Sequence, residues 1–362
     1  MPTLPTFGEP APFFRGPTLN GNEQFGFDTV AGRYVVLLFA GSAGLPAVAE
    51  AMEVVGRHRQ LFDDHRACFF GVTSNPEDAA AGRIAKQIPG IRWFLDYDRS
   101  IARLYGVADK ATAYRPCWIL LDRALNVVAT ASISRGEGLL RRLTQLVAGP
   151  KAEGFAPVLI VPRVFDRAMC RRLIDLYDGQ GGSPSGFMRD VDGVTVGIHD
   201  HNFKRRSDYY LDNEPDLRKE IRATLLRILI PQIERAFQFR ATRLERYMVA
   251  CYDGDGGGYF RPHRDNTTTG TAHRRFACSI NLNAEEYEGG DLRFPEFGSR
   301  LYRPPTGGAV VFSCSLLHEA TAVTRGRRYA YLPFFYDEAA AKLREANAAT
   351  DKVAPHLANY RA

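Results

Sequence analysis

The chain has 362 residues, more than one ordinary hydrophobic core accommodates, so its length predicts two domains or three. With 45% hydrophobic and 24% charged residues, its composition is that of a globular protein and excludes a disordered or fibrous chain. The net charge of +6 is mild for this length, so we interpret basic clusters such as Lys204–Arg206 as solvated surface and expect no nucleic-acid partner.

In the first part of the chain, strand-like runs alternate with helical runs. We predict strands at Tyr34–Phe39, Ala67–Thr73 and Trp118–Leu121, and helices at Ala47–Phe62, Ala79–Gln87 and Gly138–Ala148. This alternation predicts a small α/β domain with a central sheet over residues 1–148. Residues 149–156, rich in Gly and charged residues, are predicted to be a linker.

After the linker, two helices precede many short strands. The helices are predicted at Asp166–Tyr177 and Glu214–Phe237, and short β runs broken by Gly, Pro and Asn fill Arg246–Tyr336. This order predicts an α+β domain dominated by a jelly roll at residues 157–337. The remaining residues, 338–362, are predicted to form a peripheral helix followed by a loose end.

The start of the chain and its cysteines indicate a cellular location. Met1 to Phe14 carries no basic region followed by an apolar core, and no apolar run is long enough to span a bilayer. The six cysteines form no Cys-x-x-Cys pair, and Cys68 and Cys117 lie in or beside predicted strands, which indicates buried, reduced, structural thiols. We therefore expect a cytoplasmic protein without a membrane partner.

The first domain carries the motifs Gly8–Phe13, Gly32–Phe39 and Phe70–Thr73. In their order and spacing these resemble the thioredoxin-like peroxiredoxin family. That family places its peroxidatic cysteine at a helix start after the first core strand, where the helix N-terminus lowers the thiol pKa. Here the corresponding stretch, Gly41–Val48, contains no cysteine. We expect a catalytically silent accessory or dimerisation module, with a thiol-dependent peroxidase or redox adaptor as the alternative.

The second domain carries a His-x-Asp pair, His263 and Asp265, followed far along the chain by His318. These are the residue types of a 2-His-1-carboxylate triad, which holds Fe(II) on one face and leaves the other face open. Residues two apart on a strand point to the same side, so a strand over Tyr259–Asp265 is expected to deliver two ligands. His318 is expected to supply the third ligand from a distant strand.

Four further motifs accompany this triad: Gly256–Tyr259, Leu282-Asn283, Glu288–Phe294 and Thr324–Arg328. Together they make the second domain resemble the prolyl 4-hydroxylase-like branch of the iron(II)/2-oxoglutarate dioxygenases. The resemblance implies a double-stranded β-helix (jelly roll) with flanking helices. It also implies Fe(II), 2-oxoglutarate and O2 as cofactor and cosubstrates, and it is compatible with ascorbate as an auxiliary reductant.

In this family a cation holds the distal carboxylate of 2-oxoglutarate. The resemblance assigns that role to Arg328, about ten residues after His318 on a strand predicted at Arg328–Phe334. A guanidinium suits the task because it forms two parallel charge-assisted hydrogen bonds with a carboxylate. Arg325 and Arg327, in the preceding turn, are the alternatives.

Several other polar residues lie near this pattern in the sequence. Tyr252 and Tyr259 precede the first ligand and are candidates for a hydrogen bond to the cosubstrate or for lining the substrate mouth; the side that each faces stays open. His199 and His201 form another spaced pair, which we interpret as a polar loop near the entrance rather than a metal site. His273 is expected at the surface or in a lid.

The carboxylate at Asp265 favours hydroxylation, because related halogenating enzymes lack it and leave its place on iron to chloride. We therefore expect a hydroxylase that converts 2-oxoglutarate to succinate and CO2 and hydroxylates an amino acid, a peptide-bound residue or a small metabolite. The segments Gly179–Phe203 and Asn266–Arg275 are expected to select this substrate, but neither carries a motif that identifies it. A homodimer is compatible with the sequence.

Overall fold

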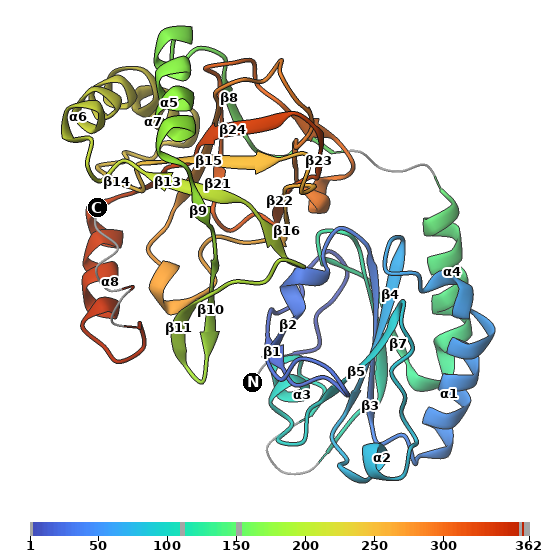
Figure 1. Ribbon diagram of the computed structural model, residues 1–362. Coiled ribbons are helices and arrows are strands. Elements are labelled where there is room, and N and C mark those ends of the chain that lie inside the picture. Colours follow the sequence, from blue (N-terminus) through green and yellow to red (C-terminus); the bar gives the residue numbers. More distant parts are fainter. Residues whose placement is uncertain (1–2, 109–112, 150–153, 355–356, 358–362) are drawn as a thin grey trace. The chain divides into compact units, whose positions relative to one another are not determined.

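The structure is a computed structural model that describes residues 3–108, 113–149, 154–354 and 357. It forms two compact units (Figure 1): Met1–Phe155 with Pro295–Gly298, and Ala156–Phe294 with Ser299–Ala362. Half of the expected linker (150–153) and half of the expected loose end (355–356 and 358–362) lie outside the described residues. Within the described part, no helix is both long and apolar enough to cross a membrane.

A five-stranded mixed sheet forms the centre of the first unit, in the spatial order β5-β4-β3-β6-β7. Its strands are β3 (Tyr34–Gly41), β4 (Ala67–Thr73), β5 (Ile91–Leu95), β6 (Cys117–Leu121) and β7 (Val127–Ser132). β3, β4 and β5 are parallel to one another, and β6 and β7 join antiparallel. Every residue of β4 is buried, as expected for a central strand covered on both faces. This is the predicted thioredoxin-like sheet.

Two amphipathic helices cover one face of this sheet (Figure 1): α1 (Pro46–Arg57) and α4 (Gly136–Ala148). Their apolar side chains pack against Trp93 and Trp118 of the sheet. The smaller elements of the unit are β1 (Arg15–Gly16), β2 (Phe25–Gly26), α2 (Glu77–Ala80), α3 (Ser100–Leu104) and 3-10 turns at Phe27–Val30, Arg59–Leu61 and Ile133–Arg135.

The helix predicted at Ala79–Gln87 is wrong, because only the single turn α2 forms there. The chain leaves that turn through Gly82, which adopts a left-handed conformation with φ +65° that ends a helix. Asp78 also works against a longer helix, since its carboxylate accepts from the Ala43 N–H (2.7 Å) and the Thr73 hydroxyl (2.5 Å). The helix predicted at Ala47–Phe62 ends earlier, at Arg57, and continues as a 3-10 turn.

Two antiparallel sheets form the second unit, the predicted jelly roll. The larger runs β14-β25-β17-β24-β15-β13-β9, with β21 paired to β17 and β8 to β21; the smaller runs β12-β16-β22-β19-β20. The strands of the larger sheet are β8 (Leu159–Val161), β9 (Ser183–Pro184), β13 (Ser207–Tyr210), β14 (Arg243–Glu245), β15 (Met248–Asp253), β17 (Phe276–Asn281), β21 (Ala309–Ser313), β24 (Arg327–Tyr331) and β25 (Phe334–Tyr336). Those of the smaller sheet are β12 (Lys204–Arg205), β16 (Tyr259–His263), β19 (Leu292–Arg293), β20 (Leu301–Tyr302) and β22 (His318–Ala320).

Three helical segments pack on one face of the larger sheet (Figure 1). They are α5 (Arg167–Gln180), α6 (Pro215–Thr224) and α7 (Ile230–Phe237), the last two joined by a π-helical stretch at Leu225–Leu229. The strands alternate beneath them: on β15, Val249 and Cys251 join the helical core, whereas Ala250 and Tyr252 belong to a cluster on the opposite face. That opposite face carries the polar residues described below.

Two hairpins and one helix complete the second unit. The hairpins pair β10 (Phe187–Val191) with β11 (Val194–Ile198), and β18 (Glu288–Gly289) with β23 (Val323–Arg325). Helix α8 (Glu338–Ala348) is the predicted peripheral helix, and Asp337 caps it by accepting from the Ala340 N–H. A short 3-10 turn lies at Thr269–Thr271, and another, at Pro295–Phe297, belongs to the first unit.

Candidate metal centre

His263 and His318 lie opposite each other on the paired strands β16 and β22. The same pairing sets Phe260 against Ala320, so β16 advances three residues where β22 advances two. This extra residue is a β-bulge, and Pro262 suits it because a proline has no N–H to donate to the ladder. The bulge turns Phe260 and His263 toward the same face, where their rings stack with centroids 3.5 Å apart.

Asp265 completes a group of three metal-binding side chains. It lies beyond the end of β16, so the expectation that one strand carries both ligands is wrong; its backbone N–H donates instead to the Cys314 carbonyl at 3.0 Å. Its carboxylate oxygens lie 3.6 Å from His263 Nε2 and 3.3 Å from His318 Nε2. One ligand atom of each residue lies within 4.8 Å of the other two, and this donor set fits Fe(II).

Backbone carbonyls orient both imidazoles toward the centre of the group. Nδ1 of His263 lies 2.7 Å from the Arg261 carbonyl, and Nδ1 of His318 lies 3.0 Å from the Leu316 carbonyl. A neutral ring that donates from Nδ1 keeps the Nε2 lone pair for a metal. Burial, followed by the effect of His318, lowers the pKa of His263 to about 3, so its ring is neutral at physiological pH.

Arg328 is a buried cation on β24, only 2% exposed. Its Nη2 donates to the Ser279 hydroxyl at 2.8 Å, and its guanidinium lies 5.1 Å from the centroid of the Tyr252 ring. Among the described residues, its Nε and Nη1 have no hydrogen-bond partner and no carboxylate is ion-paired with it. Each buried donor left unpaired costs about 1–3 kcal/mol, so the site is suited to an anion that offers two acceptors.

The backbone around Arg328 is held on both sides. The Asn283 side chain donates to the Arg327 carbonyl at 2.8 Å and accepts from the Tyr329 N–H at 2.9 Å. Gly290, with φ +68°, packs against it: a Cβ at this glycine would lie 3.2 Å from Arg328 Cδ and 2.7 Å from a valine methyl. The Asn283 amide and the Glu-Gly-Gly turn therefore position the arginine.

The triad and Arg328 line one cavity. Its walls are mainly apolar, which lowers the local dielectric and strengthens the electrostatic interactions inside. Besides the triad, its lining residues are Arg206, Arg246, Tyr252, Phe260, Ala277, Cys278, Ser279, Leu292, Phe312, Ala320, Arg328, Leu332, Pro333 and Phe334. One continuous space therefore holds the metal ligands and a cation for a carboxylate.

The remaining candidates divide between this cavity and the surface. Tyr252 faces inward and lines the cavity, whereas Tyr259 does not line it and donates its hydroxyl to the His201 carbonyl at 2.8 Å. The alternatives to Arg328 are exposed and paired with surface carboxylates, Arg325 with Glu288 and Arg327 with Asp178. Of the three candidate arginines, only Arg328 reaches the cavity.

His273 is not at the surface or in a lid, so that expectation is wrong. It is 2% exposed, and its Nε2 lies 2.6 Å from a Glu245 carboxylate oxygen. The other oxygen of that carboxylate accepts from Arg274 at 2.6 Å. His199 and His201 lie in the loop before β12, as expected, and join no metal-donor group in the described part of the chain.

Sequence reasoning missed four polar residues around the site. Lys204 and Arg206, interpreted as solvated, are buried; Lys204 Nζ donates to the Ser185 hydroxyl at 2.7 Å. Ser279 and Arg246 also line the cavity. The alternation of β17 could have shown Ser279 on the face opposite the apolar Cys278, but only tertiary structure reveals the burial of the cations.

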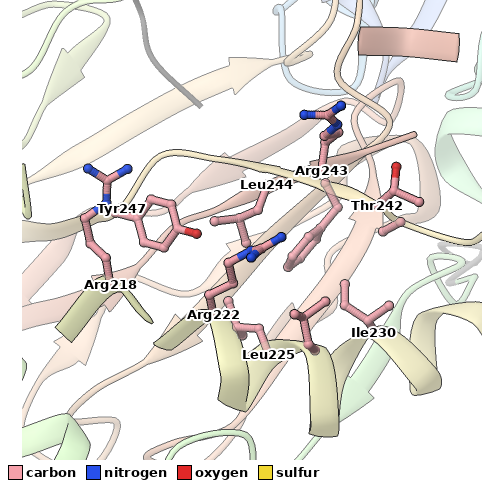
Figure 2. A pocket seen from close by; sticks show the side chains of 11 residues that line it. Arg218, Arg222, Leu225, Ile230, Thr242, Arg243, Leu244 and Tyr247 are labelled. Carbon is pink, nitrogen blue, oxygen red and sulfur yellow. The ribbon is translucent and has the colours of Figure 1, made fainter. Parts of the chain in front are cut away.

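A larger cavity, of about 280 Å³, lies between the α6–α7 segment and β14 (Figure 2). It has an apolar floor and arginines at its rim, and its lining contains no histidine, cysteine or carboxylate, so it is not a metal site. The lining residues are Arg218, Arg222, Leu225, Leu226, Ile230, Ala241, Thr242, Arg243, Leu244, Tyr247 and Phe335.

The cysteines show no reactive character. All six are free and buried. Burial raises the pKa of Cys68 and of Cys117 to about 12, so neither is a thiolate at physiological pH.

Comparison with known families assigns both units. The family model described as the 2OG-Fe(II) oxygenase superfamily matches residues 247–336, a range that contains the triad and Arg328. The second unit contains a 2OG-Fe(II) oxygenase domain. The model of the AhpC/TSA family matches residues 7–130, so the first unit is a peroxiredoxin-like domain.

Among curated proteins, the oxygenase domain is similar to PKHD-type hydroxylases. One from Cupriavidus metallidurans is 35% identical over 97 residues, which are 24% of this chain and 42% of that protein. One from Pseudomonas fluorescens is 28% identical over 190 residues, 50% of this chain and 78% of that protein. The chain spans about half the length of the first such relatives that it matches.

Solved structures resemble each unit at low sequence identity. A prolyl hydroxylase from Trichoplax adhaerens, in complex with a hypoxia inducible factor peptide fragment, is 18% identical, with a TM-score of 0.42 over 56% of this chain and 89% of that one. AhpC from Mycobacterium tuberculosis is 17% identical, with a TM-score of 0.33 over 40% of this chain and 94% of that one.

Proposed function

We propose that this protein is an Fe(II)- and 2-oxoglutarate-dependent hydroxylase. In this proposal His263, Asp265 and His318 bind the iron, and Arg328 binds the distal carboxylate of 2-oxoglutarate. The observation that carries the proposal is the buried Arg328, without a carboxylate partner among the described residues, in the same cavity as the triad. When bound, iron and 2-oxoglutarate supply the oxidation: O2, 2-oxoglutarate and a substrate C–H give succinate, CO2 and a C–OH.

The residues of the chain bind and orient the reactants. The carbonyl-bonded Nδ1 atoms fix the tautomers of His263 and His318, so the Nε2 atom of each ring is left for the metal. The Ser279 hydroxyl accepts one hydrogen bond from Arg328 Nη2. The Nε and Nη1 donors of Arg328 are left for the cosubstrate. The aromatic wall, with Phe260 stacked on His263, keeps water from the metal side.

The substrate is proposed only as a class at this stage: an amino acid, a peptide-bound residue or a small metabolite. The PKHD-type relatives support hydroxylation as the reaction type. The carboxylate of Asp265 among the metal ligands also favours hydroxylation over halogenation.

The test is Fe(II)-dependent conversion of 2-oxoglutarate to succinate by the full-length protein, with and without ascorbate, together with the iron content of the purified protein. We expect His263→Ala to lower both the iron content and the turnover by at least about tenfold, because losing even a group that only hydrogen-bonds to a metal ligand costs about 10–100-fold. His199→Ala, which removes a histidine outside the triad, is the matched control and is expected to retain both. Unchanged iron content and turnover in His263→Ala would overturn the proposal.

For the peroxiredoxin-like unit, we propose an accessory or dimerisation role over residues 1–148, with the oxygenase domain at 157–337. The missing cysteine in Gly41–Val48 and the raised pKa of the Cys68 and Cys117 thiols argue against the alternative of a thiol peroxidase. The free thiols of all six cysteines support a reducing, cytoplasmic location. Light scattering of the full chain tests the dimer: a monomer at micromolar concentration contradicts it.

A further inference from the structure

The cavity between the α6–α7 segment and β14 is separate from the proposed active site (Figure 2). Its volume of about 280 Å³ is close to the lower limit of pockets that bind small molecules, about 300 Å³. Adjacent residues of β25 divide between the two cavities: Phe335 lines this one, and Phe334 lines the cavity of the metal centre. Because neighbouring strand residues point to opposite faces, the two cavities lie on opposite sides of the larger sheet.

A π-helical stretch shapes the helical wall of this cavity. The Ile230 N–H donates to the Leu225 carbonyl, five residues earlier, as in a π-helix. Pro231 follows, and a proline within a helical run lacks an N–H and crowds the carbonyl four residues before it. The helix therefore widens for one turn, a feature that is frequent at functional sites. Leu225, Leu226 and Ile230 of this turn all line the cavity.

The floor of the cavity is apolar and partly exposed. Figure 2 shows Leu225 and Ile230 of the helical segment facing Leu244 of β14 across the cavity. Leu226, which also lines it, is 47% exposed, whereas Leu225 is 1% exposed. A ligand with an apolar body would remove the exposed leucine surface from water, which is favourable. The floor therefore suits a hydrocarbon chain or an aromatic ring.

Three arginines lie at the rim, and they differ in their partners. Arg243 is held by Glu338, because its Nε and Nη2 each donate to a carboxylate oxygen at 2.9 Å. Arg218 Nη1 lies 3.9 Å from an Asp212 oxygen, beyond hydrogen-bond distance. Within the ranges that the structure describes, no carboxylate is ion-paired with Arg222. Two of the three rim charges therefore have a carboxylate nearby, and one positive charge is left over.

Tyr247 adds a neutral hydrogen-bond donor to the same rim. Its ring centroid lies 4.6 Å from the Arg218 guanidinium, and a stacked guanidinium still directs its N–H groups outward in its own plane. Burial raises the pKa of Tyr247, and the nearby Arg222 and Arg218 offset this only in part, so the hydroxyl is protonated at physiological pH. No carboxylate is among the lining residues that the structure describes. These donors favour an anionic ligand.

We propose that this cavity binds a small amphipathic carboxylate, with its apolar body on Leu225 and Leu226 and its carboxylate at Arg222. A guanidinium holds a carboxylate through two parallel charge-assisted hydrogen bonds. The single positive charge left over at the rim matches a monoanion, which favours a carboxylate over a phosphate dianion. A fatty acid and an aryl-substituted acid share this chemistry. The inference does not depend on the proposed function, because no metal ligand belongs to this cavity.

The experiment is isothermal titration calorimetry of the full-length protein. The probes are octanoate and 3-phenylpropanoate, each beside its amide, which lacks the charge, and acetate, which lacks the apolar body. We expect at least one acid to bind with a Kd below about 1 mM and at least about tenfold more tightly than its amide and than acetate. Binding by octanoate or by 3-phenylpropanoate separates the two sources. If neither acid binds more tightly than its amide, the inference is wrong.

Matched variants locate the bound acid. We expect Arg222→Gln to weaken binding of the acid about tenfold and to leave binding of the amide unchanged, whereas Arg227→Gln, an exposed arginine of the same stretch outside the cavity, retains both. Leu226→Ser is expected to weaken both probes, and Leu301→Ser, an equally exposed leucine on β20, to weaken neither.

Arg328→Met separates this cavity from the metal centre, where a carboxylate also finds a guanidinium. We expect this variant to bind the acid as the wild type does. Acid binding that is lost in Arg328→Met and unchanged in Arg222→Gln belongs to the metal centre and overturns the inference. Because the titration needs neither iron nor turnover, its failure leaves the proposed hydroxylase standing.

Discussion

Arg328 offers a test in which stability and binding move in opposite directions. Arg328→Met keeps the length of the side chain and removes the charge. In the protein without 2-oxoglutarate, the substitution removes two buried donors that lack partners, each worth about 1–3 kcal/mol, and loses one hydrogen bond to Ser279 worth about 1 kcal/mol. We therefore expect the variant to be more stable by about 1 kcal/mol or more.

In the presence of 2-oxoglutarate, we expect the wild type to be more stable than the variant. At 100 times its dissociation constant, the cosubstrate stabilises the wild type by about 2.7 kcal/mol through mass action. The variant loses a buried charge-assisted pair, worth about 2–5 kcal/mol, so its affinity for 2-oxoglutarate falls about 30-fold or more. Thermal unfolding with and without 2-oxoglutarate, and the KM for 2-oxoglutarate, measure these effects. A variant that is less stable without the cosubstrate, yet keeps its KM, would refute the assignment.

Four further predictions concern separate residues. Asp265→Asn is expected to reduce iron content at least about tenfold, measured by metal analysis, because the metal loses its anionic ligand. Gly290→Ala is expected to raise the KM for 2-oxoglutarate, because a Cβ there crowds Arg328 and φ is +68°; an unchanged KM contradicts this. Burial raises the pKa of Asp96 to about 6, so the contribution of this group to folding stability is complete below about pH 4 and is lost as the pH rises through 6. We expect Asp96→Asn to reduce the dependence of the melting temperature on pH between pH 4 and 7, measured by thermal unfolding. Cys68→Ser is expected to leave hydrogen-peroxide consumption unchanged, and a loss of thiol-dependent turnover would restore the peroxidase alternative.

Local patterns in the sequence were sufficient for three of the five strands of the first sheet and for the three residues of the candidate metal centre. The continuous apolar run at Tyr34–Phe39 is typical of a buried strand, so this strand could be predicted without tertiary information. The grouping of His263 with Asp265 could be predicted from their His-x-Asp spacing. The end of the strand at His263, before Asp265, could not be predicted in this way, because the bulge at Pro262 depends on how β16 pairs with β22.

The burial of charged side chains could not be predicted from the sequence for a different reason. Lys204 and His273 are residue types that usually lie at the surface. They are buried here only because other segments of the chain fold over them. His273 is buried because Glu245, 28 residues away in the sequence, supplies its partner. An ion network of this kind becomes visible only when the strands that carry it are placed side by side.

The bulge before His263 makes the metal site sensitive to chain length. If one residue were deleted between Phe260 and His263, β16 could pair regularly with β22, and every side chain beyond the deletion would exchange faces. His263 would then point away from His318 although every ligand residue was still encoded. Metal binding therefore depends as much on the number of residues between Phe260 and His263 as on the identity of the histidine.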